Sequence, residues 1–148
     1  MGNLIEQLDS FITDSKMLVL LDPGHGGIVD GKYTTAPKKM YDHGNGFVLF
    51  EGVFNRKVVN NLKGMLRDAC VSFVDVVSSN SDVSLGERVR RANELTATYK
   101  DKFKVVYISV HGNAGGGTGL EVYTSVGETS SDKYAQVICE EMIKVFPD

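Results

Sequence analysis

Two histidines and one glutamate stand where their side chains could bind a metal ion. His25 lies in the turn DPGHGG after an apolar run, His111 follows the apolar run FKVVYISV, and Glu51 begins an amphipathic stretch. A catalytic zinc ion typically has three protein ligands, two His and one Glu among the known sets, and keeps a fourth position open for water. Taken alone, a histidine in a glycine-rich turn is more often an ordinary loop residue. The three together favour a metal site, provided that the fold brings them to one place.

The residues around these candidates predict strands and helices in alternation. Met17–Leu21 is apolar on both faces, which is typical of a central parallel strand covered by helices. Val71–Val77, Phe103–Val110 and Gly119–Thr124 are the other expected strands. This order predicts an α/β fold, a mostly parallel twisted sheet with helices on both faces and a site at the carboxyl ends of the strands. Both histidines fall at that edge.

Apolar residues at helical spacing predict four helices. They cover Leu4–Ile12 with Asn3 as N-cap, Glu51 to about Cys70, Ser84 to about Tyr99, and Asp132–Phe146. Ser84 and Glu87 have the spacing of a capping box. The expected buried face of the second helix is Val53, Phe54, Val58, Val59, Leu62, Met65 and Leu66. That of the last helix is Tyr134, Val137, Ile138, Met142, Ile143 and Phe146.

The segment Ile28–Phe50 has no sustained period and is expected to be a long loop, which is usually functional or mobile. Its aromatic and amide residues suit a surface that binds a polar substrate, although they could equally well be ordinary loop residues. They are Tyr33, Tyr41, His43, Asn45 and Phe47. For His43 itself, beside Asp42, we expect a solvated side chain, with substrate contact as the alternative.

Length and composition predict one globular domain, residues 1–148, and we expect a monomer. The chain has 148 residues, 42% of them hydrophobic, and a net charge of −3 without a basic block, so nucleic acid is not an expected partner. Its two cysteines, Cys70 and Cys139, are expected to be reduced. No apolar run approaches the roughly 18–20 residues that cross a bilayer, so no membrane insertion is expected. The first residues lack the basic region of a signal peptide, which predicts synthesis in the cytoplasm without one.

Five motifs, in order, resemble one known family. LDPGHGG, EGVFNRKVV, SLGERVRRAN, ISVHGNA and GLEVYTS are similar to the type-3 catalytic domain of the zinc-dependent N-acetylmuramoyl-L-alanine amidases, from about Met17 to the C-terminus. The resemblance implies that His25, Glu51 and His111 bind Zn²⁺. It also implies that the substrate is peptidoglycan and that the amide between N-acetylmuramic acid and L-alanine is hydrolysed.

The stretch Gly31–Phe50 and the expected lack of a signal peptide resemble the phage and prophage members of this family. Those members act as endolysins on the cell wall after a holin or cell damage releases them. The resemblance therefore implies action on the wall after release of this kind.

One departure from the family concerns proton transfer. The family has a general-base glutamate on a further strand near its C-terminus, whereas this chain ends at Pro147–Asp148. We therefore expect a domain without its last strand and helix, whose general base would lie beyond Asp148. Glu121 and Glu128 are poor substitutes, because strand alternation turns Glu121 away from its apolar neighbours and Glu128 stands in a polar turn. Two alternatives stay open: a zinc-bound but catalytically impaired peptidoglycan-binding module, and, less favoured, another zinc peptidoglycan hydrolase such as a stem-peptide carboxypeptidase.

For three further residues the sequence allows two possible roles each. Asp22 either fixes the tautomer of a ligand histidine or only ends its strand. Asn113 either binds substrate or caps the loop after His111, and the structural role is slightly favoured. Arg88 either belongs to a solvated helix face or anchors its helix to the sheet edge. A phosphate-binding loop at DPGHGG is disfavoured, because the glycine pattern is wrong and no helix follows directly.

Overall fold

The computed structural model describes residues 9–113 and 119–146, which fall into two compact units, 1–112 and 113–148. That all 148 residues form one domain stays a prediction. None of the helices in the described ranges is long and apolar enough to cross a membrane.

A four-stranded sheet forms the centre of the first unit, in the order β1-β7-β2-β8. β2 (Met17–Pro23) lies between β7 (Ser72–Asp75) and β8 (Lys104–Val110), and it is parallel to both. β1 (Ser10–Phe11) pairs antiparallel with β7. The predicted α/β class with a mostly parallel sheet is confirmed.

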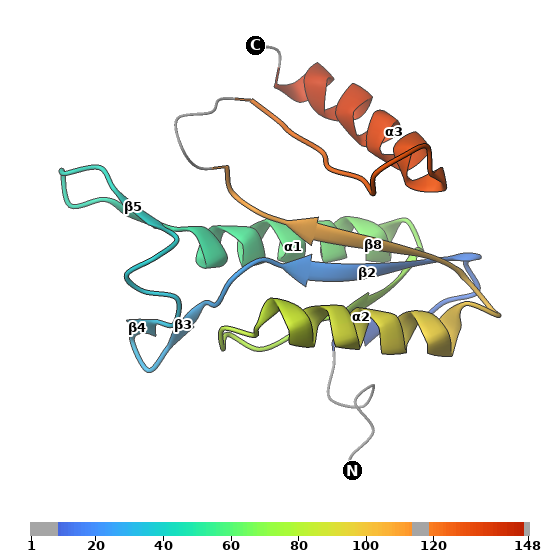
Figure 1. Cartoon of the computed structure of the whole chain (residues 1–148), viewed down its shortest axis with the longest axis horizontal. Coiled ribbons are helices and arrows are strands. Elements are labelled where there is room, and N and C mark those ends of the chain that lie inside the picture. The colour runs from blue at the N-terminus through green and yellow to red at the C-terminus, as the bar shows by residue number, and fades with distance from the viewer. Residues whose placement is uncertain (1–8, 114–118, 147–148) are drawn as a thin grey trace. The chain divides into compact units, whose positions relative to one another are not determined.

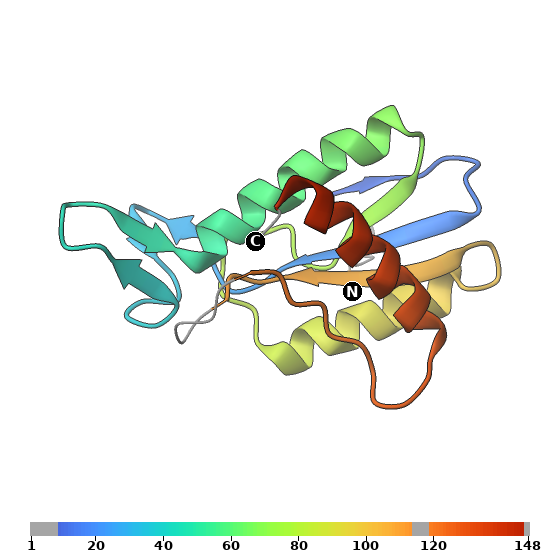
Figure 2. The same ribbon diagram turned by 90° about the horizontal axis from the view of Figure 1, so that it is seen from above.

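Two helices cover the two faces of this sheet (Figures 1 and 2). α1 (Glu51–Asp68) lies on the face to which Val19 and Leu21 point, and Val59 packs there. α2 (Leu85–Tyr99) lies on the opposite face, where Leu18 and Leu20 pack with Leu95. Because side chains alternate along a strand, one apolar strand, β2, supplies both cores.

The predicted helix Leu4–Ile12 is wrong where the structure describes it. Ser10 and Phe11 form the edge strand β1, and the Phe11 ring stacks on Phe73 with 5.9 Å between centroids. Pairing with the exposed edge of β7 and burial of this ring override a short helical pattern. Asn3, the proposed N-cap, lies outside the described residues.

The expected long loop 28–50 contains two small hairpins. β3 (Ile28–Val29) pairs with β4 (Lys32–Tyr33), and β5 (Met40–Asp42) pairs with β6 (Val48–Phe50). The β5–β6 hairpin leads directly into α1 and projects past the start of that helix (Figures 1 and 2). Strands of two or three residues carry too little periodicity to be recognised in a sequence.

The inward face of α1 is more polar than its apolar pattern predicts. The buried residues are Glu51, Gly52, Asn55, Val59 and Lys63, whereas the predicted face residues Val53, Phe54 and Met65 are exposed. Lys63 donates to Asp75 at 2.7 Å and to Asp9 at 2.8 Å, and these hydrogen bonds allow its amine to be buried. The helix is thus oriented by hydrogen bonds and ion pairs as well as by apolar contacts.

The capping box predicted at the start of α2 has two hydrogen bonds, and the structure contains one of them. The Ser84 hydroxyl accepts from the Glu87 N–H at 3.3 Å. The Glu87 carboxylate pairs with Arg90 and Arg91 and not with the backbone of Ser84, and these hydrogen bonds hold the Glu87 pKa at about 2.

The second unit contains one helix, α3 (Ser130–Val145), in its described part. Thr129 and Asp132 form a capping box at its start. The predicted strand Gly119–Thr124 is wrong, because these residues pair with no strand in the described structure. The predicted buried face of α3 is also not observed, because no residue of the helix is buried. The described part of this unit contains no second helix or strand on which α3 could pack.

Candidate metal centre

His25 occupies a strained position just beyond the end of β2. Its φ is 63°, in the left-handed region that side chains other than glycine rarely adopt. Two arginines hold its carbonyl oxygen, Arg56 Nη1 at 2.8 Å and Arg88 Nη2 at 3.0 Å. Such strain persists when the surroundings fix it, and it is most common at functional sites.

The rest of the DPGHGG turn is fixed by its neighbours in the same way. The Gly24 N–H donates to the Val110 carbonyl at 2.9 Å, and the Gly24 carbonyl accepts from Asn55 Nδ2 at 3.1 Å. The Gly27 N–H donates to the Asn80 carbonyl at 2.8 Å. These bonds fix the backbone of the turn on both sides of His25.

Glu51 is the first residue of α1, where the helix dipole favours a carboxylate. Its backbone N–H donates to the Lys39 carbonyl at 3.0 Å, and Lys39 Nζ lies 3.9 Å from Glu51 Oε2. Glu51 Oε1 accepts from the Gly112 N–H at 3.2 Å. The carboxylate thus bridges the start of α1 and the residues that follow β8.

His111 follows β8 directly, and its ring lies edge-on to the His25 ring with 4.9 Å between centroids. A Cβ on Gly24 would stand 2.3 Å from His111 Cε1, so glycine leaves the space that this ring fills. The His111 side chain is 49% exposed, whereas those of His25 and Glu51 are 20% and 11% exposed. Of the three side chains, that of His111 is therefore the most exposed.

One ligand atom from each of His25, Glu51 and His111 lies within 4.8 Å of the other two. Glu51 Oε1 stands 3.2 Å from His25 Nε2 and 3.3 Å from His111 Nδ1. Atoms bound about 2.0–2.1 Å from a tetrahedral zinc lie roughly 3.3–3.4 Å apart, so these separations suit a zinc ion. The structure therefore brings together all three residues that the sequence proposes as ligands.

The state of His25 also fits a metal ligand. Its Nε2 is buried and makes no hydrogen bond of standard geometry in the described structure, although Glu51 Oε1 lies near. Burial lowers the pKa of His25, and Glu51 only partly opposes this effect. The imidazole is then neutral at pH 7, which is the form that binds metals.

Asp22 is buried next to this site, but its carboxylate does not bond to an imidazole. It accepts from the Arg88 guanidinium, from the Tyr107 hydroxyl at 2.6 Å and from the Ser109 hydroxyl at 3.3 Å. Burial and the bond to Asp22 raise the pKa of Tyr107 to about 12, so its hydroxyl stays a donor. Arg88 connects Asp22 to the His25 carbonyl, so Asp22 supports the site through the backbone of His25.

Arg88 anchors α2 to the sheet edge, which is one of the two roles considered for it from the sequence. It is buried, and besides its bonds to Asp22 and His25 it donates to the carbonyls of Val83 at 2.8 Å and Pro23 at 2.9 Å.

The other candidate residues lie elsewhere. Asn113 is exposed and begins the second unit, and Glu121 in that unit accepts from the Tyr123 hydroxyl at 2.7 Å. Glu128 is exposed. His43 is also exposed, on the β5–β6 hairpin. Cys70 and Cys139 are not joined in a disulfide.

Two residues of α1 have roles that the sequence reasoning missed. Asn55 and Arg56 lie four and five positions after Glu51, and both bond to the turn that carries His25. Their signal in the sequence was the polar pair inside the apolar pattern EGVFNRKVV. A buried polar residue in an amphipathic helix normally has a specific partner.

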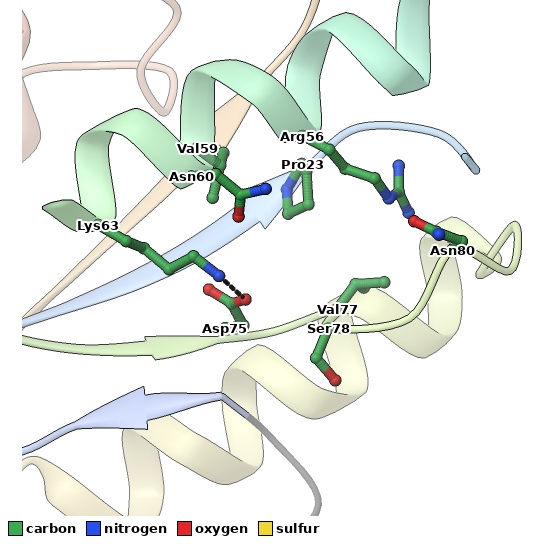
Figure 3. A pocket seen from close by; sticks show the side chains of 9 residues that line it. All are labelled: Pro23, Arg56, Val59, Asn60, Lys63, Asp75, Val77, Ser78 and Asn80. Atoms are coloured by element: carbon green, nitrogen blue, oxygen red, sulfur yellow. Dashed lines mark hydrogen bonds and ion pairs between the residues drawn. The ribbon is translucent and has the colours of Figure 1, made fainter. Parts of the chain in front are cut away.

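Two cavities in the described part of the chain lie beside α1, and neither is lined by the three ligands. One of about 120 Å³ is lined by Pro23, Arg56, Val59, Asn60, Lys63, Asp75, Val77, Ser78 and Asn80 (Figure 3). The figure shows the Lys63–Asp75 ion pair at one side of it. A metal site needs converging ligands and not a large cavity. The candidate site is therefore defined by the three ligands and not by these cavities.

The contact between the start of α1 and the His25 turn gives a test of this architecture. A Cβ on Gly52 would lie 1.8 Å from the Gly26 carbonyl oxygen. Gly52→Ala is therefore expected to lower the free energy of unfolding by about 1–3 kcal/mol. Gly64→Ala is the matched control, because a Cβ there meets nothing within 4 Å in the same helix, and it should stabilise by about 0.5–1 kcal/mol. Equal midpoints for the two variants in urea denaturation would show that this contact does not fix the site.

Fold and site together define an α/β protein with a His/Glu/His group at the carboxyl ends of its central strands. A family model described as N-acetylmuramoyl-L-alanine amidase matches residues 19–148. The chain belongs to this family.

Curated relatives agree with this assignment. N-acetylmuramoyl-L-alanine amidase CwlM of Bacillus licheniformis is 33% identical over 131 residues, which cover 86% of this chain and 44% of the relative. The sporulation-specific N-acetylmuramoyl-L-alanine amidase of Bacillus subtilis (strain 168) is 31% identical over 130 residues, which cover 85% of this chain and 43% of the relative. The chain thus spans less than half the length of these two proteins. No solved structure shows a significant match.

Proposed function

We propose that this chain binds one zinc ion through His25, Glu51 and His111 and hydrolyses the amide between N-acetylmuramic acid and L-alanine in peptidoglycan. The observation that carries the proposal is the convergence of the three ligand atoms within 4.8 Å. Membership of the amidase family, and the names of the two relatives, support the substrate and the bond.

A zinc ion bound here would supply a water of lowered pKa and polarise the scissile carbonyl. Neighbouring residues of the chain fix the positions of the proposed ligands. Arg56 and Arg88 hold the backbone of His25, and the Gly112 N–H holds the Glu51 carboxylate. Since His111 is the most exposed of the three proposed ligands, substrate is expected to approach beside its ring.

Proton transfer to the leaving nitrogen needs a positioned acid, and its absence usually costs about 10² to 10⁴ in rate. Within the described residues the His/Glu/His group contains one carboxylate, Glu51, which serves as a ligand in this proposal. A general-base glutamate beyond Asp148 stays a prediction, and so does the alternative of an impaired peptidoglycan-binding module.

Metal removal and product analysis test the proposed reaction. Purified cell wall incubated with the zinc-loaded chain should yield glycan with a free lactyl carboxyl group and stem peptide with a free L-alanine amine, both identified by mass spectrometry. Chelation should stop product formation, and zinc should restore it. Binding to the wall without products would favour the impaired module, and cleavage within the stem would favour a carboxypeptidase.

The cellular setting is part of the same proposal. Both named relatives are bacterial amidases, which supports the cell wall as the place of action. The phage-type origin and the release by a holin or by cell damage are kept as proposals from the sequence resemblance.

A further inference from the structure

Three exposed rings cluster on the β5–β6 hairpin, and we call Tyr41, His43 and Phe47 the aromatic platform. Ring centroids of Tyr41 and His43 are 4.5 Å apart, and those of His43 and Phe47 are 5.2 Å apart. Tyr41 is 61% exposed and Phe47 is 57% exposed. Exposed apolar residues that occur singly need no explanation, whereas a contiguous group of exposed rings is a candidate interaction site.

The turn that carries the platform has defined local bonds. The His43 N–H donates to the Phe47 carbonyl at 3.0 Å, and the Gly44 N–H donates to Asp42 Oδ1 at 2.8 Å. Asn45 Oδ1 accepts from the Phe47 N–H at 3.2 Å. These bonds fix the backbone of the turn, and the ring contacts keep the three side chains together, so less conformational entropy would be lost when a ligand binds.

The base of the hairpin is joined to the candidate metal centre. Met40 pairs with Phe50, the residue before Glu51, and Lys39 contacts Glu51 through its carbonyl and its amine. Tyr41 pairs with Leu49, two residues before Glu51. With a strand rise of about 3.3 Å per residue, Tyr41 lies roughly 7 Å and Phe47 roughly 13 Å along the hairpin from Glu51. A polymer bound at the metal centre can therefore reach the rings.

We propose that the aromatic platform binds sugar rings of the peptidoglycan glycan strand on one side of the scissile amide. This inference rests on the proposed function. A pyranose ring has an apolar face and a polar edge, and Tyr41 and His43 have the same combination of apolar ring and polar group. A surface for a lipid bilayer would instead present wholly apolar side chains with basic residues around them.

Charge distinguishes the glycan from the peptide stem, which carries carboxylates. Residues 40–50, MYDHGNGFVLF, contain no Lys or Arg, and Asp42 adds a negative charge. The nearest cation along the chain is Lys39, at the base of the hairpin beside Glu51. An anionic stem is thus favoured near Lys39, and the neutral sugars are favoured at the rings.

A binding experiment on the whole chain tests the platform. The probe is a tetramer of β-1,4-linked N-acetylglucosamine, titrated into the chain and followed by NMR. Tyr41→Ala and Phe47→Ala should each weaken the affinity for the tetramer about tenfold. Tyr41→Phe, which keeps the ring, should bind the tetramer with nearly the affinity of the wild type. Met65→Ala is the control, because Met65 is 68% exposed near the other end of α1.

Zinc-free and zinc-loaded protein should bind the tetramer equally, and the ring variants should keep the wild-type zinc content. These readouts separate the platform from the proposed function, since loss of zinc binding by the wild type would leave the sugar titration unchanged. Three results would overturn the platform: no binding of the tetramer at millimolar concentration, unchanged affinity in the ring variants, or preference of the platform for a free stem peptide or an anionic phospholipid vesicle.

Discussion

Replacing His111 with alanine is expected to lower the proposed hydrolysis of peptidoglycan by more than about a hundredfold and to remove most bound zinc. Loss of a group that only supports a ligand typically costs about 10- to 100-fold in affinity or activity, and loss of a ligand itself should cost more. His25→Ala and Glu51→Ala should behave alike, because each supplies one of three converging atoms. Metal analysis of dialysed protein and product analysis by mass spectrometry measure the two effects.

The third histidine provides the control for zinc content. His43 is exposed on the β5–β6 hairpin and is not part of the His/Glu/His group. His43→Ala should therefore retain the wild-type zinc stoichiometry. If it loses zinc as His111→Ala does, or if His111→Ala retains zinc, the ligand assignment is wrong.

Replacing Arg88 with alanine is expected to lower the free energy of unfolding by about 3–5 kcal/mol, since it leaves a buried charge without its partner. Arg88 and Asp22 are both buried, and Arg88 also donates to the carbonyls of Pro23 and His25. Arg88→Lys should rescue little of this loss, because an ammonium group does not reproduce the several directions of a guanidinium. Denaturant unfolding followed by circular dichroism measures the change.

Arg90 is the matched control on the same helix. Its guanidinium is exposed and pairs with Glu87 and Glu94, so Arg90→Ala should change stability little. Similar stability losses for Arg88→Ala and Arg90→Ala would contradict the anchoring role of Arg88.

The fold class and the convergence of His25, Glu51 and His111 could be predicted from the sequence for one physical reason. A strand apolar on both faces must be central, and parallel strands place their carboxyl ends at one edge. β2 and β8 are parallel neighbours, and their register pairs Pro23 with Val110, just before the two histidine segments. The start of α1 brings Glu51 to the same edge.

The errors arose where local pattern and tertiary context disagree. Ser10 and Phe11 fit a helical pattern, but pairing with β7 decides their conformation. The apolar pattern of α1 did not reveal that Asn55 and Lys63 face inward, because their partners Gly24 and Asp75 belong to other parts of the fold. The role of Asp22 was undecidable for the same reason, since it depends on Arg88, 66 positions away.

The most direct test of the proposed zinc site is extended X-ray absorption fine structure at the zinc edge, recorded on the purified wild-type chain. Metal content is measured on the same sample. We predict one zinc per chain, held by nitrogen and oxygen ligands at about 2.0–2.2 Å with imidazole scattering. His25→Ala should lower the imidazole contribution or remove the metal. A sulfur shell at about 2.3 Å, which would indicate Cys70 or Cys139, or zinc far below one per chain would contradict the proposed site.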